Sequence, residues 1–151
     1  RLEGVIPKVV TAVELPPPAA KDMHLNLYYQ LAEREIPDEA LSPQARQEAW
    51  RRKGYAAYQE GDYTAAVEQW SQWLDSDPQS AEALSLIGRA YIQKNELERG
   101  LDYYTRSLAV SPGQIHMAIR RAELLEKMNR PDEAREQLNT YARIFPENPI
   151  F

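Results

Sequence analysis

Residues 50–78 read WRRKGYAAYQEGDYTAAVEQWSQWLDSDP, and this stretch sets a pattern that returns twice further along the chain. Corresponding residues lie 34 positions apart, without a gap between units. Self-similarity at a fixed period of this length is the signature of a repeat architecture. Large residues, small residues and proline recur in register, and the five sets are Trp50, Leu84 and Ala118; Gly54, Gly88 and Ala122; Ala66, Gly100 and Ala134; Trp70, Tyr104 and Leu138; and Pro78, Pro112 and Pro146.

Each unit predicts two helices separated by a short turn. Ser42 can cap the first helix, and Pro43 suits its first turn because a missing N–H costs nothing there. Gly61, Asn95 and Asn129 interrupt the helical pattern in the middle of the three units. The expected helices cover residues 43–59, 63–76, 80–94, 97–110, 114–128 and 131–144.

The recurring small and large residues have a packing reason. Small residues such as Gly54, Gly88 and Gly100 let neighbouring helices approach closely. Large side chains such as Trp70 and Tyr104 fill the space between layers. Each helical glycine costs about 1 kcal/mol relative to alanine, which closer packing offsets. One hairpin cannot bury its apolar face alone, so stability comes from the interfaces between neighbouring units.

Over about residues 47–148 this pattern resembles the tetratricopeptide repeat family. The chain departs from the family pattern at Gly100, where alanine is usual, and at Ala118 and Leu125, where larger residues are usual. The resemblance implies an all-α solenoid of three helix-turn-helix hairpins. It also implies a right-handed superhelix whose concave face is lined by the first helix of each hairpin and grips an extended peptide or a partner helix.

Mapped onto this chain, the resemblance predicts a protein-binding groove. Tyrosine and arginine are the residue types best able to anchor a partner, so Tyr55, Tyr58, Arg51 and Arg89 are the expected anchors. The arginines favour an acidic or amphipathic partner segment. The concave face also presents Glu48, Gln59, Glu82, Ser85 and Lys127. The predicted partner-binding residues are Arg51, Tyr55, Tyr58, Arg89, Ile92, Gln93, His116, Ile119, Arg120 and Glu123.

One subclass of the family binds a C-terminal carboxylate through a clamp of basic residues and asparagines. Arg51 and Arg120 match its basic positions, and His116 stands where lysine is usual. The two asparagine positions hold Tyr55 and Leu86 instead. Because both amide donors are lost, the resemblance argues against a chaperone cofactor of that subclass.

The composition excludes several other functions. A net charge of −5 and the lack of a basic block argue against nucleic acid as a partner. No cysteine is present, and His24 and His116 are the two histidines, so neither a metal site nor a catalytic residue is predicted. Nothing suggests a cofactor, an enzyme active site or direct membrane insertion, since no apolar run reaches the ~20 residues of a membrane span.

The ends of the chain leave alternatives open. We expect an extended Pro-rich arm over residues 1–21, a helix and its connection over 22–42, the repeat domain over 43–148 and a truncated end over 149–151. Residues 1–20 are expected either to act as a flexible tether or to lie in the concave groove of this chain or of a neighbour. Tyr55 and Tyr58 are expected either to face the groove or to pack against a helix at 22–35. Two further functions stay open. One is self-assembly into a homo-oligomer through the arm or the uncapped end, and the other is regulation of a larger enzyme.

Overall fold

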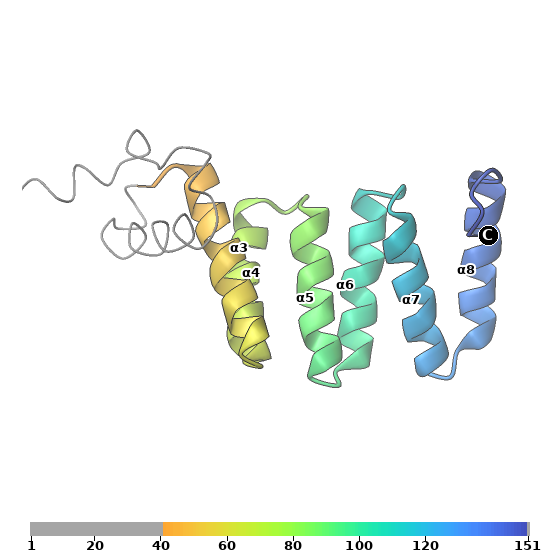
Figure 1. Ribbon diagram of the computed structural model, residues 1–151, viewed down its shortest axis with the longest axis horizontal. Helices are drawn as coiled ribbons and strands as arrows, with labels where there is room; N and C mark the ends of the chain where they lie inside the picture. Colours follow the sequence, from red (N-terminus) through yellow and green to blue (C-terminus); the bar gives the residue numbers. More distant parts are fainter. Residues whose placement is uncertain (1–40, 151) are drawn as a thin grey trace, which may run out of the picture. The chain divides into compact units, whose positions relative to one another are not determined.

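A computed structural model describes residues 41–150 of the chain (Figure 1). This part is all-α, and no strand occurs between Leu41 and Ile150. The bounds predicted from the sequence agree with the structure to within one residue, and the arm at 1–21 and the helix at 22–35 lie outside the described residues. The helices are α3 (Pro43–Gln59), α4 (Tyr63–Ser76), α5 (Ala81–Gln93), α6 (Leu97–Val110), α7 (Ile115–Lys127) and α8 (Pro131–Ile144).

Local capping defines where several helices begin. The Ser42 hydroxyl accepts a hydrogen bond from the Ala45 amide at 3.1 Å, as predicted for the start of α3. Asp62 caps α4 in the same way with a 3.0 Å bond from the Ala65 amide. Ser80 accepts from the amide of residue 83 at the start of α5. Each cap satisfies an amide that has no partner inside its helix.

The turn inside each hairpin depends on one residue in the left-handed backbone region. Gly61 has φ 82°, Asn95 has φ 63° and Asn129 has φ 62°. Glycine adopts this region freely and asparagine tolerates it better than most residues. The three positions that interrupt the helical pattern in the sequence are therefore the three sharp turns of the structure.

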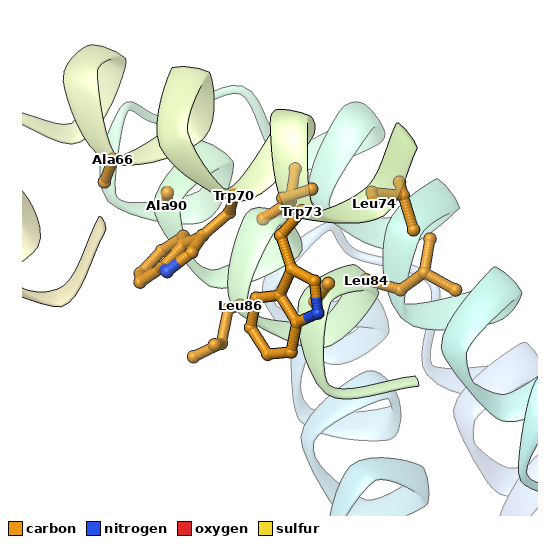
Figure 2. Close-up of a cluster of buried hydrophobic side chains, with 9 residues drawn as sticks. Ala66, Trp70, Trp73, Leu74, Leu84, Leu86 and Ala90 are labelled. Atoms are coloured by element: carbon orange, nitrogen blue, oxygen red, sulfur yellow. The ribbon is translucent and has the colours of Figure 1, made fainter. Parts of the chain in front are cut away.

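Successive helices from α4 to α8 pack each against the next. Figure 1 shows α5, α6, α7 and α8 side by side and alternating in direction, joined by short turns. The buried side chains form two clusters. The first joins α4 to α5 around Trp70 (Figure 2), and the second joins α6, α7 and α8 around Tyr104 and Leu125.

The repeated glycines mark places where a bulky side chain lies directly against a helix backbone. A Cβ atom at Gly54 would lie 2.2 Å from the indole nitrogen of Trp70. That same indole N–H donates to the Arg51 carbonyl at 3.1 Å, so the ring is held flat against α3. A Cβ atom at Gly88 would lie 2.7 Å from the Tyr104 ring. Close helix approach therefore compensates the low helix propensity of these glycines.

Polar contacts tie the second and third hairpins together. The Arg121 guanidinium donates to the Thr105 hydroxyl at 2.8 Å and to the Gln137 side chain at 2.5 Å. The Gln137 amide in turn donates to the Ala118 carbonyl. Arg121 thus links α6, α7 and α8, and its desolvation lowers its pKa from the ordinary arginine value.

The last helix presents a polar surface on one side. A shallow hollow there is lined by Arg135, Glu136 and Asn139, among other residues of α8. The large apolar side chains exposed in the described part of the chain are Ile144 and Ile150, at 60% and 55%.

Candidate functional site

A cavity of about 280 Å³ lies between the first helices of the three hairpins and is named here the central cavity. Helix α3 contributes one residue, α5 three, α6 one and α7 four. The lining residues are Tyr58, Arg89, Ile92, Gln93, Tyr104, Arg120, Glu123, Leu124 and Lys127.

Tyr104 brings a hydrogen-bond donor into the central cavity. Its side chain is only 3% exposed, yet its hydroxyl has no hydrogen-bond partner among residues 41–150. Burial raises the pKa of this phenol above its usual value, and the charges of Arg120 and Arg89 partly oppose that shift. The hydroxyl therefore stays protonated near neutral pH and can donate a hydrogen bond.

An aromatic cluster supports Tyr58 in one wall of the central cavity. The Tyr58 ring centroid lies 5.1 Å from that of Tyr63 and 5.9 Å from that of Trp70. The Arg89 guanidinium lies over the Tyr58 ring at 5.4 Å from its centroid. Because a cation is attracted to an aromatic face, this contact orients Arg89 across the boundary between the first two hairpins.

The central cavity is more basic than the chain as a whole. Arg89, Arg120 and Lys127 line it, and within the described part of the chain none of them forms an ion pair. Glu123 is the one carboxylate in the lining. The cavity therefore carries a formal excess of two positive charges, three minus one, in a chain whose net charge is −5.

A second cavity, of about 430 Å³, lies at the start of α7. It is bounded by the loop before α7 and by the segment after α8, and Arg120 lines both cavities. The remaining lining residues are Gly113, Gln114, Ile115, His116, Met117, Asn148 and Ile150.

Comparison with known proteins identifies the family. The family model of the tetratricopeptide repeat matches residues 25–81, 51–115 and 86–149. The chain belongs to the tetratricopeptide repeat family. This confirms the resemblance predicted from the 34-residue period, and domains of this family generally mediate protein–protein interaction and are typically non-catalytic.

Individual tetratricopeptide proteins show a more distant likeness. Mouse sperm-associated antigen 1 is 28% identical over 98 residues, which is 65% of this chain but 11% of that relative. A crystal structure of MamA superposes with a TM-score of 0.67 at 17% identity, covering 97% of this chain and 78% of MamA. The second tetratricopeptide domain of human RPAP3, in complex with the HSP70 peptide SGPTIEEVD, gives 0.62 at 18% identity, covering 72% and 90%. The two structures establish the fold alone.

The central cavity of this tetratricopeptide chain brings together six of the ten predicted partner-binding residues. Tyr58, Arg89, Ile92, Gln93, Arg120 and Glu123 line the central cavity. His116 and Arg120 line the second cavity. Arg51, Tyr55 and Ile119 line neither of the two cavities.

Two of the predicted anchors make contacts within the first two hairpins. Arg51 forms an ion pair with Glu82 at 3.0 Å and lies over the Tyr55 ring at 5.5 Å. Tyr55 meets Trp70 edge to face, with ring centroids 5.4 Å apart. Leu86, at the second asparagine position of the carboxylate clamp, is buried. The two positions that hold asparagine in the carboxylate clamp therefore carry no side-chain amide in this chain.

Sequence reasoning did not place Tyr104 and Leu124 in the site. Tyr104 is expected in the core as a large residue of the repeat pattern, and it does belong to the second buried cluster. It also lines the central cavity, because its ring packs over Gly88, where no side chain blocks the way. The glycine at that repeat position was the available signal.

Residues 41–150 were compared with the requirements of a metal site and of a membrane-spanning helix. No three histidine, cysteine, aspartate or glutamate side chains there are grouped so that they could hold a metal ion. Among the helices of the same region, none has the length and apolar character needed to cross a bilayer.

Proposed function

We propose that this chain is a non-catalytic scaffold that holds a peptide segment or helix of a partner protein in its concave tetratricopeptide groove. The observation that carries the proposal is the central cavity, in which α3, α5, α6 and α7 converge. A ligand there contacts all three hairpins at once, which suits recognition without chemistry.

The lining of the central cavity supports binding of a side chain from a partner. Tyr58, Ile92 and Leu124 supply apolar surface, and the arginines supply hydrogen-bond donors. Polar groups fix the orientation of a bound ligand, and the apolar surface adds contact area. Aromatic and arginine side chains contribute most to binding energy at protein interfaces.

The RPAP3 structure supports peptide binding by a domain of this fold. That domain has the same fold and was solved with a peptide. In this chain Tyr55 and Leu86 occupy the asparagine positions of the carboxylate clamp. We therefore propose that the groove recognises an internal segment of its partner and does not require a free C-terminus.

Blocking the central cavity tests this function. Peptides selected on residues 1–151 from a displayed random library are expected to bind Gln93→Trp at least about tenfold more weakly than the parent protein. Gln93 is exposed and lines the cavity, so an indole there occupies the site without disturbing the core. Affinity is measured by isothermal titration calorimetry.

The matched control is Gln72→Trp, the same change at an exposed position of α4 that lines neither cavity. It is expected to leave peptide affinity unchanged. If the selected peptides bind both variants as tightly as the parent, they bind outside the groove and the proposal is wrong.

A further inference from the structure

We propose that the central cavity binds a glutamate or aspartate carboxylate of an extended acidic partner segment, through Arg89, Arg120 and the Tyr104 hydroxyl. This inference rests on the proposed function of the groove and names the chemistry that the groove selects. The second cavity then receives an apolar side chain of the same segment.

Three side chains with hydrogen-bond donors, Arg89, Tyr104 and Arg120, line the central cavity. The Tyr104 side chain is largely buried, and its protonated hydroxyl lines the cavity without a partner in the described structure. The charges of Arg120 and Arg89 both act on this hydroxyl, Arg120 the more strongly. A carboxylate placed among these groups accepts charge-assisted hydrogen bonds, which are about twice as strong as neutral ones.

Within the described residues, no carboxylate of the chain forms an ion pair with Arg89 or Arg120. Other arginines of the described chain hold carboxylates of their own, such as Arg51 with Glu82 and Arg130 with Glu133. Arg89 instead stacks on Tyr58, which orients the guanidinium without neutralising it. The cavity therefore offers positive charge that the chain itself leaves unbalanced.

Glu123 limits which anion fits. It lines the same cavity and acts on the Tyr104 hydroxyl in the sense opposite to the arginines. A phosphate carries nearly two negative charges at neutral pH and is repelled more strongly by this carboxylate. Because the basic residues also attract a doubly charged anion more strongly, a phosphoserine probe decides between phosphate and the proposed carboxylate.

The two cavities lie one after the other along α7. Leu124 lines the central cavity and Met117 lines the second, seven residues earlier on the same helix. At about 1.5 Å per residue this separation is about 10 Å, which an extended peptide covers in about three residues. An acidic side chain and an apolar side chain three positions apart therefore match the central cavity and the second cavity.

Fluorescence anisotropy with a defined probe tests the inference. The probe is a fluorescein-labelled, C-terminally amidated peptide of sequence Gly-Leu-Glu-Glu-Glu-Leu-Gly, in which each leucine lies three positions from a glutamate, compared with its counterpart in which every glutamate is glutamine. The acidic probe is expected to bind at least about tenfold more tightly. Its affinity should fall as salt is raised from about 50 mM to about 500 mM, because added ions screen the charges.

Substitutions then assign the effect to named groups. Arg89→Gln and Arg120→Gln are each expected to weaken the acidic probe about five- to tenfold, and Tyr104→Phe about threefold. Glu123→Gln should strengthen it about twofold, because a repulsive charge is removed. The glutamine probe should bind all four variants and the parent alike.

Arg106→Gln is the matched control. The Arg106 guanidinium also lies over a tyrosine, Tyr103, at 4.7 Å, but it lines neither cavity. Its loss is expected to leave binding unchanged. Circular dichroism confirms that each variant is folded, and Tyr104→Phe keeps the buried ring, so the test does not depend on one fragile substitution.

Three outcomes overturn the inference. Equal binding of the acidic and glutamine probes shows that no carboxylate is recognised. Weakening by Arg106→Gln as large as that by Arg89→Gln shows a non-specific charge effect. Tighter binding of a probe carrying phosphoserine in place of the central glutamates assigns the site to phosphate. In each case the groove function still stands if library-selected peptides respond to Gln93→Trp.

Discussion

Replacing Trp70 with alanine is expected to lower the free energy of unfolding by about 4 kcal/mol, because a fully buried indole is lost and a large void remains. Trp70 is 1% exposed and lies in the cluster that joins α4 to α5 (Figure 2). Its N–H bond to the Arg51 carbonyl and its edge contact with Tyr55 are lost as well. Urea denaturation followed by circular dichroism measures the change.

The control for Trp70→Ala is Glu68→Ala, an exposed position on the same helix. That change is expected to alter stability by less than about 0.5 kcal/mol. A loss below about 1 kcal/mol for Trp70→Ala would contradict the packing described for the first cluster, because so small a loss is typical of surface positions.

Replacing Gly54 with alanine is expected to destabilise the protein by about 2 kcal/mol, although alanine is the better helix former by about 1 kcal/mol. The new methyl group would lie 2.2 Å from the Trp70 indole nitrogen. That ring is confined by the core and by its bond to Arg51, so it cannot move aside at low cost. The same urea titration measures the effect.

Gly113→Ala is the matched control for Gly54→Ala, because a methyl group there meets no atom within 4 Å. It should change stability by less than about 0.5 kcal/mol. Combining Gly54→Ala with Trp70→Phe should cost less than the sum of the two single changes, because the smaller ring leaves room for the methyl group. Strict additivity would show that the two residues do not clash.

The helices were predictable because their ends depend on local residues. Ser42 caps α3 through its own side chain, and Gly61 supplies the left-handed turn after it. The prediction began the helix at residue 80, but Ser80 is its cap and α5 starts at Ala81. The prediction also ended this helix at residue 94. In the structure α5 ends one residue earlier, at Gln93, because Asn95 already turns the chain.

The site was less predictable because a repeat period does not tell which neighbour a side chain meets. Arg51 and Arg89 were both predicted as anchors on the first helix of their hairpins, yet Arg51 pairs with Glu82 while Arg89 lies in the central cavity. The difference arises from the ring of Tyr58, on which Arg89 stacks. Tyr104 reached the cavity through packing against Gly88, which depends on tertiary structure.

The uneven burial of the helices has a consequence for how the chain opens. Helix α5 holds six buried residues, whereas Ala134 is the buried residue of α8. Local opening is cheapest where few apolar contacts are lost, so amide hydrogen exchange should be slowest in α5 and fastest in α8. Asn148 and Ile150, which follow α8, close one side of the second cavity. That cavity should therefore open more often than the central cavity, whose lining comes from α3, α5, α6 and α7.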